Sequence, residues 1–163
     1  MKIFDAWYFP DEETHIPEWM QEHYRWVDGR LSYQYLKYEA AVKACRRRRV
    51  AVDIGAHVGL WSYWMVRDFG VLHAFEPRPV HQECWLANML SRQGVFRLHE
   101  CALGAYKGWI DIKTDDPASS GNTYVLNQNS GSVPQQTLDS FGFDQGDFIK
   151  IDCEGYEYFV LQG

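Results

Sequence analysis

One segment constrains the fold of this chain more than any other: the apolar run Val50–Ile54, which leads directly into two glycines, Gly55 and Gly59. A short apolar run bounded by charged residues and glycine is typical of a strand buried in a parallel sheet. Gly55 allows a turn that other residues disfavour, and Gly59 allows a ligand to approach the start of the next helix closely. In an open α/β sheet, such a strand-to-helix crossover is where nucleotide-like ligands bind.

The remaining apolar patterns predict strands that alternate with helices. We expect buried strands over residues 71–75 and 148–152, a further strand over 96–102 and an exposed antiparallel strand over 108–114. We also expect a loop over 115–131, and helices over 32–49, 60–69 and 79–94 and from 156 onward. Parallel strands joined by helices need cover on both faces of the sheet. The sequence therefore predicts an α/β fold with a Rossmann-like, doubly wound, mostly parallel sheet.

Composition narrows the class of protein. The chain has 163 residues, of which 46% are hydrophobic and 23% charged, and its net charge is −6. The length is enough for one domain with one core, the composition argues against disorder, and the acidic net charge disfavours nucleic acid as a partner.

The four cysteines form no C-x-x-C pair, which predicts free thiols. No apolar run approaches the roughly 18 residues that cross a bilayer, and the first residues lack an apolar signal core. We expect a cytoplasmic protein with no membrane partner.

The N-terminal part differs in composition from the rest. Aromatic residues make up 16% of the chain, and many of them lie in the first 38 residues. Pro10 and Pro17 argue against one long helix there. We expect residues 1–44 to form an aromatic-rich segment with a helix, acting as a lid or an interface, and residues 45–163 to form the Rossmann-like domain.

The spacing of acids and glycines favours one kind of ligand. A dinucleotide fingerprint reads G-x-G-x-x-G, whereas this chain has G-x-x-x-G and places Asp53 two residues before the first glycine. An acid there repels a pyrophosphate but suits a ligand that carries an amine and a sulfonium. Glu76 follows Asp53 by 23 residues, at the end of the next strand, where a carboxylate can accept both hydroxyls of a ribose. These features favour S-adenosylmethionine over NAD, and a nucleotide-binding oxidoreductase of the NAD type is the alternative.

Three stretches of the chain resemble the FkbM type of S-adenosylmethionine-dependent methyltransferase. They are residues 50–61 together with the F-E-P at 75–77, the Q-T-L-D-S-F-G at 136–142, and the D-F-I-K-I-D-C-E-G-Y-E at 147–157. The last two are the more specific to the family. Cys153 stands where an apolar residue is usual, a small departure that a buried thiol fits. The resemblance implies a class I methyltransferase fold, with S-adenosylmethionine as methyl donor and S-adenosylhomocysteine as product.

The resemblance also implies which residues hold the cofactor. Asp53 and the glycine loop would line its methionine end, Glu76 would bind the ribose, and the segment 102–104 would flank the adenine. The full set of implied contacts is Asp53, Gly55, Ala56, His57, Gly59, Leu60, Glu76, Pro77, Ala102, Leu103 and Asp152.

Two acids are the candidates for catalysis. If the acceptor is a hydroxyl, a nearby base helps methyl transfer. Asp152 and Glu154 are placed for this role, because alternation along a strand end puts both on one side at the ligand-binding edge. For Glu154 the alternative is a structural role, bonding backbone amides at the start of the next helix. A pair of acids also suits a divalent metal, but no further ligand set is evident, so we predict no metal.

The methyl acceptor is less constrained by the sequence. A small molecule or a carbohydrate with a hydroxyl is the expected acceptor. Tyr33 and Gln34 could fold over the site, and Asn122 and Tyr124, on either side of Thr123, could touch the acceptor.

The chain ends at Gly163, soon after the predicted strand 148–152. The family's sheet would normally continue with further strands, so the resemblance implies an incomplete domain whose last strands are missing. An open sheet edge invites pairing, which predicts a homodimer. It also raises a third possibility, a fragment that binds the cofactor without catalysis.

Overall fold

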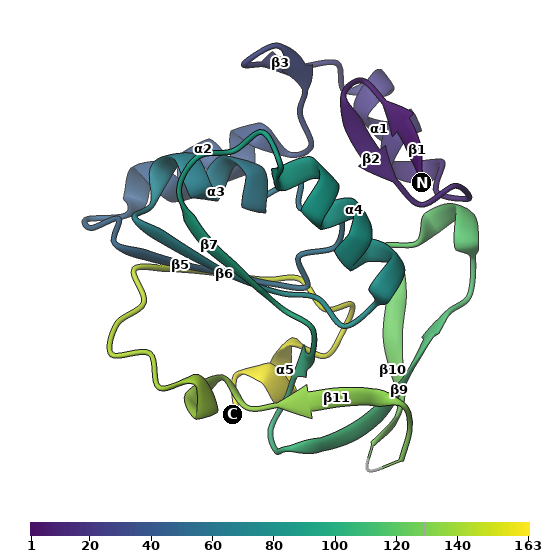
Figure 1. Ribbon diagram of the computed structural model, residues 1–163, viewed down its shortest axis with the longest axis vertical. Coiled ribbons are helices and arrows are strands. Elements are labelled where there is room, and N and C mark those ends of the chain that lie inside the picture. Colours follow the sequence, from purple (N-terminus) through teal and green to yellow (C-terminus); the bar gives the residue numbers. More distant parts are fainter. Residues whose placement is uncertain (129) are drawn as a thin grey trace.

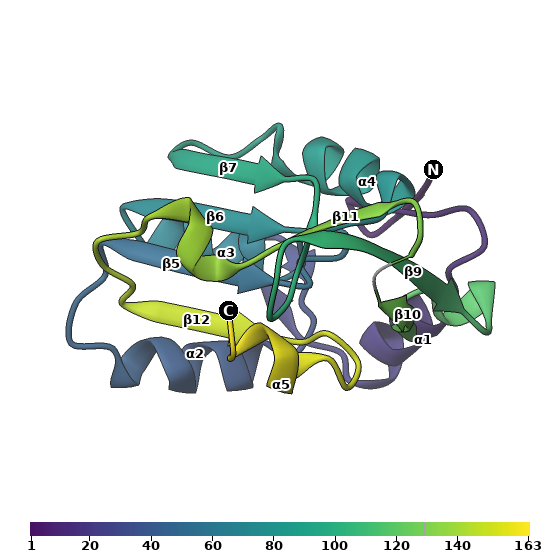
Figure 2. The same ribbon diagram turned by 90° about the horizontal axis from the view of Figure 1, so that it is seen from below.

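The computed structural model describes residues 1–128 and 130–163. Its centre is a parallel sheet of four strands in the order β12-β5-β6-β7, visible as a stack in Figure 2. The strands are β5 (Val50–Ile54), β6 (Val71–Phe75), β7 (Val95–His99) and β12 (Phe148–Ile151). Helix α3 (Ser62–Asp68) joins β5 to β6, and α4 (Pro79–Met89) joins β6 to β7. The predicted α/β fold is confirmed.

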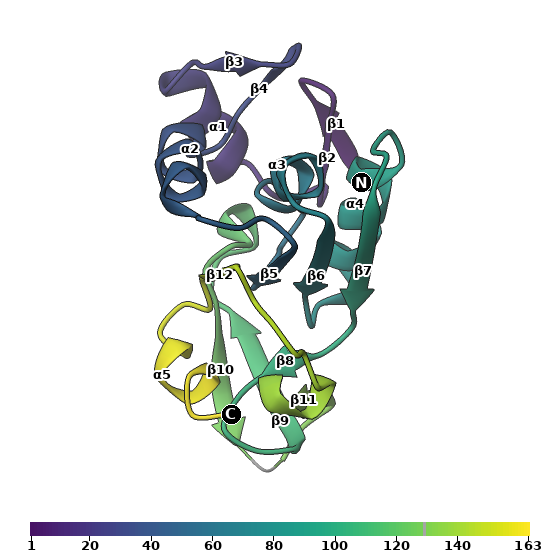
Figure 3. The same cartoon turned by 90° about the vertical axis from the view of Figure 1, so that its left-hand side faces the viewer.

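The two faces of this sheet bury different residues, because side chains alternate along each strand. Ala51, Leu72 and Ala74 belong to a core that includes Trp64 and Trp85 of the connecting helices. The opposite face buries Val52, Ile54 and Phe75 in a second cluster. Figure 3 shows α2 (Tyr35–Ala44), α3 and α4 on one side of the sheet, and the short helix α5 (Glu157–Val160) on the other.

The strand order contains a reversal next to β5. The chain moves outward from β5 to β6 and β7, and later returns to pair β12 with the other side of β5, in the register Lys150 to Asp53. In open α/β sheets, the carboxyl ends of strands at such a reversal form a crevice that binds ligands.

A second sheet lies beyond that end of the first and has the order β10-β9-β11-β8 (Figure 3). Its strands are β8 (Ala102–Leu103), β9 (Gly108–Thr114), β10 (Thr123–Gln128) and β11 (Val133–Gln136). Strand β9 is antiparallel to both neighbours, as predicted. The single predicted strand over 96–102 is wrong in its bounds: β7 ends at His99, and Ala102 starts a strand of this other sheet.

The prediction of a continuous loop over 115–131 is also wrong, because it contains β10 and the short 3₁₀ helix η1 (Pro117–Ser119). The Asp, Ser, Asn and Gly that suggested a loop flank a run of Thr123, Tyr124 and Val125, residue types that favour strands. Asn129 of the predicted loop lies outside the described residues. A second 3₁₀ helix, η2 (Leu138–Phe141), precedes β12.

The N-terminal segment shares the main core. It forms two hairpins, β1 (Lys2–Phe4) with β2 (Trp7–Phe9) and β3 (Trp26–Val27) with β4 (Arg30–Leu31), and the helices α1 (His15–Glu22) and α2. Trp7 and Phe9 are fully buried in the same cluster as Trp64 and Trp85. In Figure 1 this segment lies above α3 and α4. Its role as a lid or an interface stays a prediction.

The described helices end earlier than the patterns suggest, since α4 stops at Met89 and α5 at Val160. Among the described residues, none of the helices combines the length and apolar character needed to cross a membrane.

Two histidines on the sheet face opposite α3 make stability depend on pH. His73 and His99 are neighbours on β6 and β7, with Nδ1 of His73 3.0 Å from Nε2 of His99, and His99 stacks on Phe75. Burial, then His73 and Arg97, lower the pKa of His99 to about 4. Burial and Arg97 also lower the pKa of His73.

Because the unfolded chain binds a proton at these sites near pH 6.5 and the folded chain does not, acid favours unfolding. We expect the free energy of unfolding to fall as pH drops from 6.5 to about 4. Urea titrations across that range should show His99→Gln losing less stability than the wild type, by on the order of 1 kcal/mol for partly exposed groups. If the free energy of unfolding changed with pH in the same way in both proteins, the lowered pKa of His99 would not be the cause.

Candidate active site

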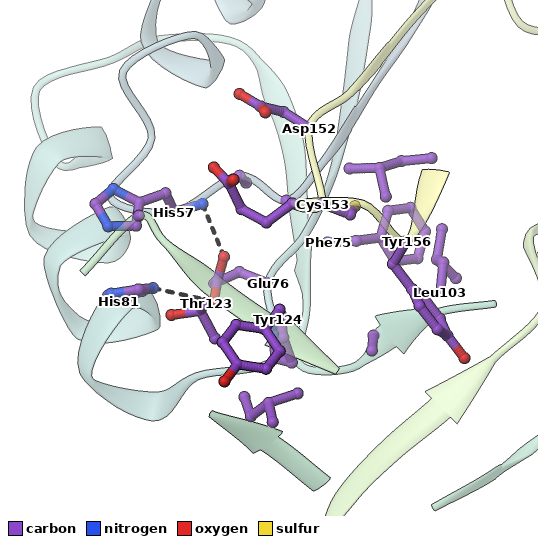
Figure 4. Close-up of a pocket in the computed structure, with 18 of the residues that line it drawn as sticks. His57, Phe75, Glu76, His81, Leu103, Thr123, Tyr124, Asp152, Cys153 and Tyr156 are labelled. Atoms are coloured by element: carbon purple, nitrogen blue, oxygen red, sulfur yellow. Dashed lines mark hydrogen bonds and ion pairs between the residues drawn. The ribbon is translucent and has the colours of Figure 1, made fainter. Parts of the chain in front are cut away.

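A cavity opens where the parallel strands end. It contains about 1010 Å³ of space between atoms, part of it open to solvent. Residues at the carboxyl ends of β5, β6 and β12 form its floor, strands β9 and β10 face them, and Ile16 and Tyr33 of the N-terminal segment add a wall. Figure 4 shows the side chains that point into it.

The turn after β5 brings backbone close to backbone. Gly55 has a φ of +72°, and a Cβ at this position would lie 2.0 Å from the carbonyl oxygen of Asp152. The amides of Gly55 and Ala56 both donate to the carbonyl of Phe75, each at 3.0 Å. Only glycine fits between the tips of β5 and β12, and the turn exposes Ala56, His57 and Leu60 to the cavity.

Gly59 plays a different part from the one that its spacing suggests. Its φ is +89°, and a Cβ here would lie 2.8 Å from the ring of Trp85 on α4. It is buried and is not among the residues that line the cavity. The first turn toward α3 packs against this tryptophan, which leaves no room for a Cβ at position 59, and the cofactor contact of Gly59 stays a prediction.

Asp53 also lies behind the cavity wall. Its side chain is fully buried and accepts a hydrogen bond from the Ser62 hydroxyl at 2.6 Å. Its other oxygen lies 3.2 Å from the ammonium of Lys150, which in turn donates to the carbonyl of Gly55 at 2.6 Å. Burial lowers the pKa of Lys150, but Asp53 and Asp152 outweigh it and hold the pKa above its ordinary value. This charge pair ties the glycine turn to β12.

Lys150 lines the cavity, and sequence reasoning missed it. The signal was present, because a lysine in the middle of the apolar run Phe148–Ile151 is unusual for a buried strand unless a carboxylate faces it. The register that pairs it with Asp53 is set by the sheet and is not written in the local sequence.

Glu76 lies at the end of β6 with its carboxylate in the cavity (Figure 4). Oε2 accepts from the His57 amide at 2.8 Å, and Oε1 accepts from the Arg78 amide at 3.0 Å and lies 3.2 Å from Nδ1 of His81. A carboxylate offers about four acceptor positions. These contacts leave one position on Oε2, so Glu76 can accept a further hydrogen bond from a ligand there.

The imidazole of His57 lines the cavity next to His81. Burial, followed by His81, Lys150 and Arg78, lowers its pKa well below the ordinary value, so the ring is neutral at physiological pH. Its Nε2 is 3.0 Å from the hydroxyl of Ser120, and its ring makes an edge-on contact with His81 at 4.0 Å between centroids.

The two candidate catalytic acids both line the cavity. The Asp152 side chain is 57% exposed and lies 3.9 Å from the Lys150 ammonium. Burial, then Asp152 and Glu157, raise the pKa of Glu154. Glu154 stands beyond the end of β12 with a φ of +50°, so a tight turn places it there rather than strand alternation.

The structural role weighed for Glu154 is filled by a different acid. Oε1 of Glu157 accepts from the backbone amides of Cys153 and Gly155, at 2.9 and 3.3 Å. This leaves the Glu154 side chain free to face the cavity.

The four candidate acceptor contacts divide into two pairs. Tyr33 and Tyr124 line the cavity, and the Tyr124 hydroxyl donates to Asp115 at 3.2 Å. Gln34 lies outside it but donates to the hydroxyl of Tyr33 at 3.0 Å. Asn122 is not among the lining residues either and donates to the hydroxyl of Ser119 at 2.9 Å. Burial, then Asp152, raise the pKa of Tyr33, which keeps its hydroxyl protonated.

The far end of the cavity is apolar. Pro77, Ala102 and Leu103 line it as the sequence suggests. They are joined by side chains that sequence reasoning did not single out: Phe75, Ile110, Ile112, Val125 and Tyr156. Ile110, Ile112 and Val125 come from β9 and β10, and only the folding of the second sheet over the first brings them to the site.

Fold and site together define an α/β protein with a ligand cavity at the carboxyl edge of a parallel sheet, apolar at one end and rich in carboxylates at the other. A comparison with protein-family models matches residues 53–163 to the methyltransferase FkbM domain. The match spans more than half of the chain, so the protein belongs to the FkbM methyltransferase family. Comparisons with curated proteins and with solved structures gave no match.

Proposed function

We propose that the protein transfers a methyl group from S-adenosylmethionine to a hydroxyl of a small molecule or carbohydrate, on a sheet of the class I methyltransferase type. The observation that carries the proposal is the carboxylate of Glu76, held at the tip of β6 in the cavity with one acceptor position open. A carboxylate at the end of this strand suits a ribose hydroxyl.

The donor set of the cavity fits such a cofactor. The apolar walls at Pro77 and Leu103 suit an adenine ring, and Glu76 beside them suits the ribose. The acids at the other end, Asp152 and Glu154, suit a ligand with a positively charged sulfur and amine. Gly55, where a Cβ would meet the Asp152 carbonyl, keeps the tips of β5 and β12 together at the edge of the cavity. When bound, the cofactor supplies a methyl group on an activated sulfur.

The chain's own task is then to position the acceptor and accept its proton. Asp152 lines the cavity, its side chain is 57% exposed, and its carboxylate lies 3.9 Å from the ammonium of Lys150. It is the better placed base. Burial raises the pKa of Glu154, as do Asp152 and Glu157, and this carboxyl group suits holding a hydroxyl. Tyr33, protonated, can donate to the same acceptor.

The two alternatives make different demands on the cavity. An NAD-type oxidoreductase needs a site for a pyrophosphate, yet the described cavity has Glu76, Asp152 and Glu154 on its lining and its one lysine paired with Asp53. A protein that binds the cofactor without catalysis would use the same residues, but it would need neither Asp152 nor Glu154 as a base. The expected homodimer and cytoplasmic location stay predictions.

Titration calorimetry with S-adenosylhomocysteine tests the proposal. We expect micromolar binding by the wild type, and a loss of about tenfold or more in affinity for Glu76→Gln, because the amide cannot accept from both neighbouring amides and a ligand hydroxyl. Glu83→Gln, on the exposed part of α4, is the control and should bind as the wild type does.

Binding of NAD in place of S-adenosylhomocysteine would favour the oxidoreductase. Binding of S-adenosylhomocysteine without methylation of any hydroxyl compound in a mass-spectrometric screen would favour a protein that binds the cofactor without catalysing methyl transfer.

A further inference from the structure

A chain of hydrogen bonds links the N-terminal segment to the glycine loop. It starts at Glu13, whose side chain is fully buried just before α1. Oε1 accepts from the amide of Ile16 at 2.9 Å, and Oε2 accepts from both the amide and the hydroxyl of Ser120, at 2.6 and 2.5 Å. The hydroxyl of Ser120 lies 3.0 Å from Nε2 of His57.

The proton positions along this chain follow from what each group can do. A carboxylate only accepts, so the Ser120 hydroxyl proton points to Glu13. The serine oxygen must then accept from His57, which places the imidazole proton on Nε2. With the pKa of His57 held low, the ring has one proton, and Nδ1 carries a lone pair.

The same reasoning fixes the neighbouring histidine. The Arg78 guanidinium can only donate, so Nε2 of His81 accepts from it at 3.3 Å, and the His81 proton is on Nδ1 and points to Glu76. The edge-on contact between the two rings, at 4.0 Å, sets their relative orientation. Figure 4 shows both histidines meeting Glu76, one through its backbone amide and one through its ring.

We propose that Glu13 is a positioning residue for the cofactor site: through Ser120 it fixes the tautomer and orientation of His57, and so holds the amide that orients the Glu76 carboxylate. Glu13 lies outside the matched family region of 53–163. His57 itself has a φ of +51°, a conformation that a non-glycine residue adopts only when its surroundings hold it. The N-terminal segment thereby becomes part of the site.

The effect on cofactor affinity rests on the proposed function, but the tautomer of His57 does not, and the test separates the two. The first measurement is a two-bond ¹H–¹⁵N correlation spectrum of the ligand-free protein with labelled histidine, in which the loss of signals in His57→Asn assigns His57. We expect Nε2 protonated and Nδ1 unprotonated in the wild type, and a mixture of tautomers in Glu13→Gln and Ser120→Ala.

The second measurement is the affinity of each variant for S-adenosylhomocysteine. We expect Glu13→Gln and Ser120→Ala to bind about tenfold more weakly, because a buried charge-assisted hydrogen bond is lost. Glu12→Gln changes the exposed neighbouring acid and should change neither the spectrum nor the affinity.

Ser120→Ala carries a smaller risk of misfolding than Glu13→Gln, because it removes one hydroxyl and keeps the hydrogen bond from the backbone amide of residue 120 to Glu13. It therefore tests the chain of hydrogen bonds even if Glu13→Gln does not fold. An unchanged His57 tautomer in the folded variants overturns the proposal. The expected tautomers in a wild type that binds no S-adenosylhomocysteine support the hydrogen-bond chain and overturn the proposed function alone.

Discussion

Replacement of Asp53 by asparagine should destabilise the protein by about 3–5 kcal/mol, the range found when one partner of a buried ion pair is removed. The Asp53 side chain is 0% exposed and that of Lys150 12% exposed, and their charged atoms lie 3.2 Å apart. Asparagine can still accept from Ser62, so the loss reports the buried charge of Lys150, which is left with Asp152 at 3.9 Å. Urea denaturation gives the free energy of unfolding directly.

A double-mutant cycle makes this expectation specific to the pair. Lys150→Met alone should also destabilise, because it leaves the Asp53 carboxylate buried with Ser62 as its hydrogen-bond donor. The double variant Asp53→Asn, Lys150→Met should lose less stability than the sum of the two single variants. The control is Glu39→Gln on α2, which breaks an exposed pair with Lys43 at 3.1 Å and should change stability by less than about 0.5 kcal/mol. Additive losses in the cycle would show that the two charges do not depend on each other.

This pair also shows where sequence reasoning succeeds and where it stops. The position of Asp53 at the end of a buried strand follows from the apolar run and the glycine after it, and the structure places it there. Its side chain points to α3 rather than to the cavity, because it shares the sheet face of Ala51, which packs against the helices. A residue's place along a strand can be predicted from local sequence, whereas its face depends on which side of the sheet the next helix covers.

The same limit explains the cavity. Residues that follow the parallel strands directly, such as Glu76, Pro77 and Asp152, could be assigned to the site because parallel strands bring their carboxyl ends to one edge. Ile110 and Val125 could not be assigned, since they reach the cavity through the antiparallel sheet β10-β9-β11-β8, part of which was predicted to be a loop. The role of Glu13 could not be predicted for a further reason. Its neighbours in the sequence are polar, and a buried acid among polar neighbours has the same local pattern as an exposed one.

Replacement of Gly55 by alanine should have the other large effect, on both stability and binding. A Cβ at Gly55 would lie 2.0 Å from the Asp152 carbonyl oxygen, so the tips of β5 and β12 would have to separate. The backbone at a φ of +72° adds a penalty of about 1–2 kcal/mol for any residue with a Cβ. We expect a total loss of at least about 3 kcal/mol, as in the more severe class of point mutations, and loss of S-adenosylhomocysteine binding.

Gly142→Ala separates the two causes of this loss. Gly142 also has a positive φ, of +62°, but an added Cβ there would meet no atom within 4 Å. It should therefore show the conformational penalty of about 1–2 kcal/mol alone and keep its affinity for the ligand. The difference between the two variants measures the backbone contact that joins the glycine turn to the strand bearing Asp152. If both variants lost the same stability, that contact would contribute nothing, and the close approach of β5 and β12 could not be what requires glycine at position 55.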